Sequence, residues 1–187
     1  MTLGEYPDKV PPAWLIEPKQ FAAEDDIGRF PDVAGVLGLA GNGLSGGVVM
    51  EDFDHDGFLD LMVSTSGFVP EKDQIRVYRN NGDGTFTDAT FPGGLGVNTQ
   101  FLGWGVAFLD MDHDTWPDIF IANGHVYPEA DVLGSNNAYR QRKVVYWNKR
   151  NGTFRDISLA AGPAVQVPKS SRGLAVGDVD NDGALEI

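Results

Sequence analysis

The stretch DFDHDGFLD at residues 52–60 decides the fold, because two further copies of it follow in the chain. They read DMDHDTWPD at residues 110–118 and DVDNDGALE at residues 178–186. Each copy carries an acid at positions 1, 3, 5 and 9 of its nine residues. Acids this close repel one another unless they surround a hard cation, and Ca²⁺ takes six to eight oxygens in a tolerant geometry. We therefore predict up to three Ca²⁺ loops, numbered one to three in chain order.

The predicted ligands of each loop are its four acids and the backbone carbonyl of position 7. Mg²⁺ fits this set less well, since it prefers few protein ligands and keeps its waters. A turn with solvated carboxylates explains one such loop by chance, but three copies in register favour metal binding. The predicted ligands are Asp52, Asp54, Asp56, Phe58 and Asp60, then Asp110, Asp112, Asp114, Trp116 and Asp118, then Asp178, Asp180, Asp182, Ala184 and Glu186.

An EF-hand is the first alternative, because its loop begins with similar spacing. That loop requires a bidentate Glu at position 12 and a helix on each side. Position 12 is Val63 in the first copy and Ile121 in the second. The flanking runs are short, apolar and rich in β-branched and aromatic residues, as in GGVVME and IFIAN, which indicates buried strands. We therefore predict a strand, a calcium loop and a second strand.

Charge and composition exclude several classes of protein. The net charge is −13, and twelve of the 27 acids lie in the three loops, so the rest of the chain is nearly balanced. Nucleic acid is a poor partner, because it would require a basic footprint. The chain has no Cys, which excludes disulfides and thiolate metal sites. It contains no apolar run of about 18 residues, so we predict no membrane span.

The first 29 residues are predicted to form a Pro-rich linker or tether, since prolines at this density prevent regular structure. Residues 30–187 contain a repeat instead. Phe30, Phe86 and Phe154 are each followed two residues later by Asp, and a calcium loop begins 22, 24 and 24 residues after each Phe. Asn-Gly and Asp-Gly pairs after residue 80 and after residue 150 are strong hairpin signals. This period predicts tandem four-stranded units, with a surface insertion at residues 125–139.

We predict an all-β fold, a partial β-propeller with calcium loops between its strands. It would contain about two full four-stranded blades and partial blades at both ends. Propellers close with typically four to eight blades, and the chain stops directly after loop three, which would leave a strand edge unpaired. We therefore expect a fragment of a longer protein whose remaining blades are missing.

Four stretches carry a family resemblance: DFDHDGFLDLMVS, YRNNGDGTFTDAT, ANGHVYPEAD and SRGLAVGDVDNDGALEI. They resemble the FG-GAP/VCBS repeats, best known from integrin-α propellers, and more narrowly the bacterial cartilage-acidic-protein-like propellers that often carry an ASPIC/UnbV domain. The resemblance covers about residues 30 to 187. It implies Ca²⁺ in each blade loop, a seven-bladed propeller in the whole protein and an extracellular, periplasmic or lumenal setting. The family's ligand positions fall on Asp52, Asp54, Asp56 and Asp60 and on their counterparts in the other copies.

Two copies depart from the pattern. Loop two has Thr115 at position 6 and Pro117 at position 8. A β-branched residue at positive φ costs on the order of 1–3 kcal/mol, so we expect either a different backbone path or a weaker affinity there. In loop three the last acid is Glu186, whose additional methylene lengthens its reach.

Other motifs receive structural interpretations. GNGLSGG at residues 41–47 matches both a dinucleotide fingerprint and a nucleophile elbow, but each of these requires a following helix, so we assign its glycines to close backbone packing. His55 and His113 are predicted to be exposed. His125 could form a site with Glu129 and Asp131, but a structured turn is preferred. Aromatic residues in strands and loops are assigned to core and inter-blade packing: Trp104, Phe108, Trp116, Tyr146 and Trp147.

The sequence favours a calcium-binding module for protein or glycan binding or scaffolding, in an extracellular or periplasmic setting and not an enzyme. One alternative is a fragment of a calcium-dependent, polysaccharide-active enzyme with a propeller fold, which would need a general base and a charge stabiliser beside the ions. The candidates for those roles form no recognisable constellation: His125, Arg140, Arg142 and Lys143. Another is a purely structural segment whose binding surface lies in other blades.

Overall fold

The computed structural model describes residues 8–16, 18–22, 28–41, 44–66, 75–132 and 138–187. Contacts divide the chain into two compact units, Met1–Asp32 and Val33–Ile187. The first unit contains two short 3-10 helices, η1 (Pro12–Trp14) and η2 (Pro18–Phe21). The predicted domain bounds, 1–29 and 30–187, stay a prediction.

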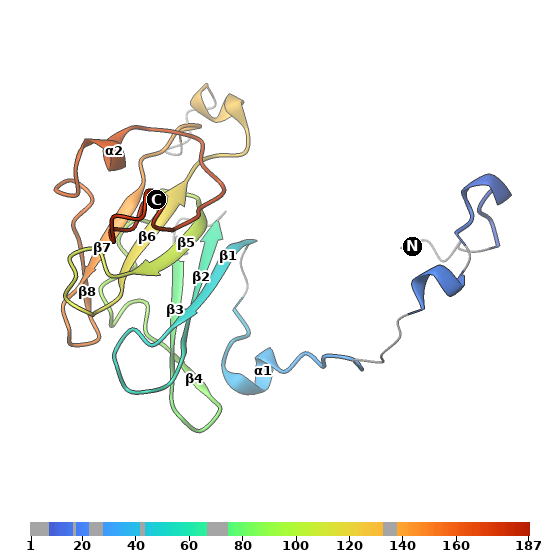
Figure 1. The fold of residues 1–187 in the computed structure, drawn as a ribbon, viewed down its shortest axis with the longest axis horizontal. Helices are drawn as coiled ribbons and strands as arrows, with labels where there is room; N and C mark the ends of the chain where they lie inside the picture. The colour runs from blue at the N-terminus through green and yellow to red at the C-terminus, as the bar shows by residue number, and fades with distance from the viewer. Residues whose placement is uncertain (1–7, 17, 23–27, 42–43, 67–74, 133–137) are drawn as a thin grey trace. The chain divides into compact units, whose positions relative to one another are not determined.

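The second unit holds two four-stranded antiparallel sheets, which lie side by side through β1 and β5 (Figure 1). In each sheet the strands follow one another in chain order, as expected for a blade built from consecutive hairpins. Both sheets confirm the predicted all-β class and the two four-stranded units of a partial propeller. The strands are β1 (Leu44–Glu51), β2 (Asp60–Ser66), β3 (Ile75–Asn80) and β4 (Phe86–Asp88), then β5 (Gly103–Leu109), β6 (Asp118–Asn123), β7 (Val144–Asn148) and β8 (Phe154–Asp156).

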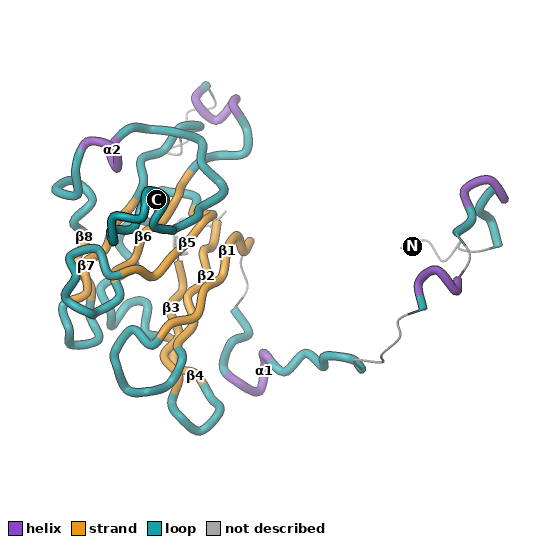
Figure 2. The backbone as a smooth tube through the Cα atoms, viewed as in Figure 1, coloured by secondary structure: helices purple, strands orange, loops and turns teal. Residues whose placement is uncertain are grey.

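Short helices and long connections surround these strands (Figure 2). The helices are α1 (Ala34–Leu37), η3 (Pro128–Asp131) and α2 (Pro163–Gln166). Residues 133–137 of the predicted insertion lie outside the described residues.

Each copy of the nine-residue stretch occupies the same place in its repeat. The residue before the loop pairs with the last acid of the loop, as Glu51 with Asp60 and Leu109 with Asp118. In the third copy the same pairing is an isolated antiparallel bridge between Gly177 and Glu186. The predicted order of strand, acidic loop and strand is therefore confirmed for loops one and two, and loop three keeps the first pair of that ladder.

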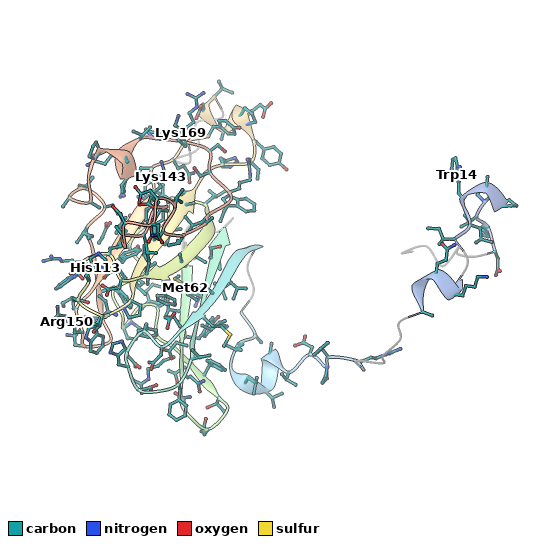
Figure 3. All side chains as sticks on the ribbon, viewed as in Figure 1. Trp14, Met62, His113, Lys143, Arg150 and Lys169 are labelled. Atoms are coloured by element: carbon teal, nitrogen blue, oxygen red, sulfur yellow. The ribbon has the colours of Figure 1, made fainter. Side chains whose placement is uncertain are left out.

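One hydrophobic core spans both sheets. Met62 of β2, which is fully buried (Figure 3), belongs to the same cluster as Ile119 and Ile121 of β6. Phe120, between those two isoleucines, points to the other face and packs with Val145 and neighbours in a second cluster. Because alternate residues of a strand face opposite sides, β6 is buried on both faces.

The first strands of the two sheets, β1 and β5, approach each other closely through their backbones. The register shifts between Ser45 and Val48 in β1, and again at the equivalent place in β5. A Cβ atom on Gly47 would lie 2.7 Å from the carbonyl oxygen of Trp104, and one on Gly46 would lie 3.0 Å from its Cα. These glycines are therefore required for close backbone packing, as predicted. The described part of the glycine-rich stretch continues into the strand β1 and not into the helix that a dinucleotide site or a nucleophile elbow requires.

Candidate metal centres

Loop one is organised by hydrogen bonds from its backbone to its first and last acids. Asp52 accepts bonds from the N–H groups of Asp56 (3.1 Å) and Gly57 (2.9 Å). Asp60 accepts one from Phe53 at the start of the loop (3.1 Å) and one from Asn80 at the end of β3 (2.8 Å). The last acid thus joins the loop, β2 and β3.

The other two loops repeat these bonds. In loop two, Asp110 accepts from Asp114 (2.9 Å) and Thr115 (2.8 Å), and Asp118 accepts from Met111 (3.1 Å) and Asn148 (2.8 Å). In loop three, the longer side chain of Glu186 still reaches the N–H of Val179, at 2.7 Å, while Asp178 accepts from Asp182 and Gly183.

The backbone follows the same path in all three loops. Position 4 has positive φ throughout, at 57° for His55, 58° for His113 and 61° for Asn181. Position 6 is at 90° in the two loops with Gly and at 76° for Thr115. The different path that we considered for loop two is therefore wrong, because the bond from Thr115 to Asp110 holds the same turn. The strain of a β-branched residue at positive φ remains.

Carboxylates gather at positions 1, 3 and 9 of every loop. In each group the three residues offer oxygens that all lie within 4.8 Å of one another. The groups do not include the position 5 acids, whose Oδ1 atoms accept bonds from the N–H of position 7, at 2.9 Å in loop one and 2.8 Å in loops two and three. Ligation by those acids and by the carbonyls of Phe58, Trp116 and Ala184 stays a prediction. The groups are Asp52, Asp54 and Asp60, then Asp110, Asp112 and Asp118, then Asp178, Asp180 and Glu186.

Burial gives these carboxylates a reason to hold a cation. Asp60 is completely buried, and burial raises its pKa to about 6, with Asp54 and Asp56 pushing in the same direction against two backbone hydrogen bonds. Burial likewise raises the pKa of Asp118 to about 6. A divalent cation would favour the ionised form of each group. The oxygen-only donor set and its negative charge fit Ca²⁺.

Two tryptophans contact side chains of the first two loops. The imidazole of His55 stacks on the indole of Trp116, with ring centroids 4.2 Å apart. His55 and His113 are both exposed, as predicted, but the stack joins loop one to loop two in a way the sequence did not indicate. Trp147 donates from Nε1 to Oδ2 of Asp112 at 2.9 Å. The predicted packing role of these tryptophans therefore includes contacts with the loops themselves.

The candidate site around His125 is used for local structure. Nδ1 of His125 accepts a bond from the N–H of Tyr127 (3.0 Å), and Asp131 accepts one from the N–H of Tyr139 (2.7 Å). The described part of this connection therefore forms the structured turn that we preferred.

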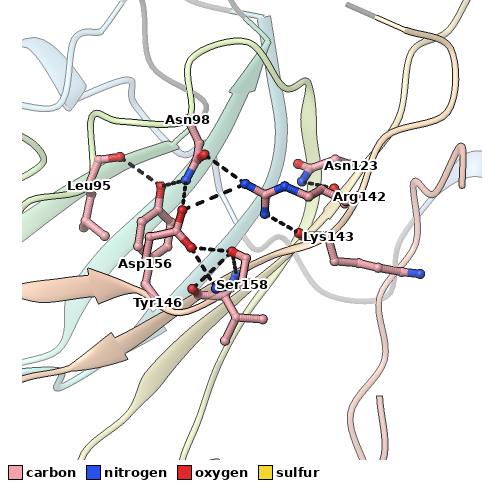
Figure 4. A network of polar contacts seen from close by, with 9 residues as sticks. Leu95, Asn98, Asn123, Arg142, Lys143, Tyr146, Asp156 and Ser158 are labelled. Atoms are coloured by element: carbon pink, nitrogen blue, oxygen red, sulfur yellow. Dashed lines mark hydrogen bonds and ion pairs between the residues drawn. The ribbon is translucent and has the colours of Figure 1, made fainter. Parts of the chain in front are cut away.

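A polar network between the β4–β5 connection and the second sheet was missed from the sequence (Figure 4). Asn98, on the connection from β4 to β5, donates to Tyr146 Oη (2.8 Å) and to Asp156 (2.9 Å), and Tyr146 in turn donates to the carbonyl of Leu95 (3.2 Å). Burial raises the pKa of Tyr146 to about 12. Arg142 stacks over a nearby phenylalanine ring and lies 4.0 Å from Asp156. These groups bond one another, so we assign the network to holding the connection on the second sheet.

A cleft of about 390 Å³ adjoins loop one. Its polar lining includes Asp54 and Arg79 beside the loop, Asp88 on β4, and Asn151 and Thr153 in the hairpin between β7 and β8. Arg79 lies 3.7 Å from Asp54 and its side chain is 54% exposed. A ligand bound in this cleft would therefore contact both the guanidinium of Arg79 and the carboxylate of Asp54, which is a candidate metal ligand.

Comparison with known proteins identifies the repeats. A family model described as FG-GAP-like repeat matches residues 52–121 and 129–187, which include all three loops. Cartilage acidic protein 1 from Homo sapiens is 31% identical over 160 residues, covering 83% of this chain and 20% of that protein. Cartilage acidic protein 1 from Mus musculus is 28% identical over 187 residues, covering 97% and 25%. The chain thus spans a fifth to a quarter of the length of these relatives. Among the described residues, no helix has the length and apolar character needed to cross a membrane.

Proposed function

The chain belongs to the FG-GAP-like repeat family, and on that premise we propose that it is a calcium-stabilised, propeller-type module that binds a protein or glycan partner. The observation that carries the metal half of this proposal is the threefold grouping of carboxylates at positions 1, 3 and 9. Each group lies in a loop of the same backbone conformation. Chance acidity on a surface would not repeat both the grouping and the backbone.

The ion's role in this proposal is structural. The last acid of loops one and two already joins three segments of its sheet through backbone hydrogen bonds. Its burial opposes ionisation, so without a cation the folded state carries an electrostatic penalty at that joint. When Ca²⁺ is bound it supplies positive charge to all three carboxylates. The blade loop then keeps one conformation and presents a defined edge to a partner.

The stabilisation by calcium depends on the setting. Extracellular calcium modules have dissociation constants of roughly 0.1–1 mM. At about 1 mM Ca²⁺, a site of about 0.1 mM contributes about 1.4 kcal/mol to the free energy of unfolding. That contribution is a useful fraction of the stability of an ordinary domain. We therefore propose an extracellular or periplasmic setting, where such calcium levels hold.

The binding role is proposed to be non-catalytic. The alternative, a calcium-dependent enzyme acting on polysaccharide, requires a free base and a free charge stabiliser beside the ions. Among the described residues, His125 uses Nδ1 in its turn, and Lys143 donates to the carbonyls of Ala164 and Val167. Arg142 lies against Asp156. His125, Arg142 and Lys143 thus have structural contacts away from the three loops.

Thermal unfolding tests the proposal most directly. We would compare the chain in EGTA, in about 2 mM Ca²⁺ and in the same concentration of Mg²⁺. This Ca²⁺ concentration would fill calcium sites of the extracellular class. A melting temperature that rises with Ca²⁺ and not with Mg²⁺ is expected. The same melting temperature in EGTA and in Ca²⁺ would overturn the metal half. Binding of glycan or protein libraries with and without Ca²⁺ tests the partner half.

A further inference from the structure

A positive charge from the hairpin between β7 and β8 lies against loop two. The guanidinium of Arg150 places Nε 2.7 Å and Nη2 2.6 Å from Oδ2 of Asp114. The other oxygen of Asp114 accepts a bond from the N–H of Trp116 at 2.8 Å. The side chain of Asp114 is only 8% exposed, whereas that of Arg150 is 53% exposed. The position 5 acid of loop two is therefore engaged at both oxygens by the protein itself.

The backbone of Arg150 adopts a conformation that is costly for arginine. Arg150 lies in the hairpin between β7 and β8 at φ 61°. The equivalent residue between β3 and β4 is Gly82, at φ 75°, and both hairpins close with the same bond, from Lys149 to Thr153 and from Asn81 to Thr85. Residues other than Gly are uncommon there, and such strain persists where the surroundings over-determine it. The contact with Asp114 is one such constraint.

Loop one provides the matched comparison. Gly82 has no side chain that could reach Asp56, and a Cβ atom on it would lie 2.7 Å from the ring of Phe58. Loop one has its own arginine, Arg79, but this lies 3.7 Å from the position 3 acid, Asp54. In loop one an arginine lies 3.7 Å from the position 3 acid, whereas in loop two an arginine lies 2.6 Å from the position 5 acid.

We propose that Arg150 is a tethered cation that stabilises loop two without metal and lowers its affinity for Ca²⁺ relative to loop one. This inference rests on the proposed calcium binding. A guanidinium and a divalent ion compete for the same carboxylate, since both need its negative charge and its oxygens. Loop one therefore fills at lower Ca²⁺ than loop two, and the chain responds to calcium in two stages.

Two substitutions test the charge on residue 150 while leaving a long side chain at the same positive φ. Arg150→Gln keeps a long side chain at positive φ and deletes the charge, while Arg150→Lys keeps the charge and loses the planar fork. Arg150 lies at the surface, so these variants are expected to fold. Arg79→Gln removes the arginine of loop one and is the matched control. All variants are made in the full chain, alone and in a background with Asp54→Asn and Asp180→Asn, which leaves loop two as the intact loop.

Two readouts test the inference, the melting temperature of metal-stripped protein and calorimetric titration with CaCl₂. Arg150→Gln is expected to lower the melting temperature of metal-stripped protein. It is also expected to tighten Ca²⁺ binding at loop two by about two- to fivefold, the range set by one partly exposed ion pair. Arg150→Lys should give smaller changes of the same sign. Arg79→Gln should leave the affinity of loop two unchanged.

Three outcomes would overturn the inference. If Arg150→Gln leaves both readouts unchanged, or weakens Ca²⁺ binding, Arg150 is not a competing cation. If Arg79→Gln alters loop two as strongly, the effect is general charge and not the contact with Asp114. If the parent chain binds no Ca²⁺, the proposed function fails and the affinity half of the inference fails with it. A lower melting temperature of Arg150→Gln without metal would then still support the stabilising half.

Discussion

The side chain of Asn148 donates a hydrogen bond from Nδ2 to the backbone carbonyl of Phe53, at 2.9 Å, across 95 residues of chain. Asn148 ends β7 in the second sheet, and Phe53 is the second residue of loop one in the first. The same Nδ2 donates to the carbonyl of Pro117 in loop two, at 3.0 Å. One buried amide therefore holds the first two acidic loops together.

Asn148→Ala is expected to destabilise the chain by about 1–3 kcal/mol, because two carbonyls lose their donor in a buried place. Asn80→Ala is the matched control, since among the described residues the side chain of the equivalent Asn80 donates only to the carbonyl of Leu59, in an exposed position. Urea unfolding of both variants in EGTA measures the difference. Equal losses for the two would show that the link between loops contributes nothing beyond the local hairpin.

The stack between His55 and Trp116 should be measurable as an interaction energy. A double-mutant cycle with His55→Ala and Trp116→Ala is expected to give a coupling of about 0.5–1.5 kcal/mol in the free energy of unfolding, as for aromatic pairs. His113→Ala with Trp116→Ala serves as the control, because His113 holds the same loop position without a recorded ring contact among the described residues. Additive losses for His55 and Trp116 would contradict the contact.

Metal-stripped protein should become less stable as pH rises from about 4 to about 6. The pKa of Asp60 and of Asp118 is raised by burial from 3.8 to about 6, so the folded chain binds more protons than the unfolded chain in this window. Carboxyls whose pKa is lowered in the folded chain, such as Asp83, affect the pH dependence of stability below that window.

With Ca²⁺ this decline should be smaller, since the ion favours the ionised form and so displaces these protons from the folded chain. Melting curves across the window, on protein stripped by a chelating resin and on the same protein with Ca²⁺ added, check both slopes. The variant Asp118→Asn should reduce the slope without metal. A stability that rises with pH in metal-stripped protein would contradict the assigned pKa directions.

Positions 3 and 9 of a loop should respond differently to substitution. Asp118→Ala leaves the N–H groups of Met111 and Asn148 without an acceptor, and each such buried group costs about 1–3 kcal/mol. Asp112→Ala loses an exposed bond from Trp147 and should cost about 0.5 kcal/mol or less in EGTA.

Both substitutions should remove the calcium response of loop two, measured by calorimetry in the background with loops one and three disabled. Asp112→Ala is the cleaner test, because it separates metal binding from folding. Retained Ca²⁺ binding by Asp112→Ala would exclude position 3 as a ligand.

Local sequence pattern was sufficient for the strands, the acidic loops and the hairpins, because each of these depends on residues within one repeat. The grouping at positions 1, 3 and 9 follows from that local turn, and so does the positive φ at position 6. The path of loop two was predicted less well, since the identity of Thr115 does not reveal that hydrogen bonds to Asp110 hold it in place.

Contacts between residues far apart in the chain could not be predicted in this way. Asn148 with Phe53, Asn98 with Tyr146 and Arg150 with Asp114 are separated by 95, 48 and 36 residues. No short motif marks these pairs. Asn148 with Phe53 depends on how one sheet sits on the next, and Arg150 with Asp114 depends on how the hairpin between β7 and β8 lies against loop two in the same sheet. Calcium itself, the setting and the partner stay proposals, because they depend on chemistry outside the chain.

The contact between β1 and β5 is made by backbone atoms, so one repeat can follow another with the same spacing between sheets. At Gly46 and Gly47 the spacing of the sheets is set by main-chain atoms of Trp104, which every amino acid shares. Gly105 stands against Leu174 in the same manner, one repeat later. Exposed side chains in and beside the acidic loops, such as Thr115 and Arg150, can therefore differ between repeats without altering how the backbones of neighbouring sheets meet. The exposed residues of one loop could be exchanged for those of another while the sheets keep their spacing.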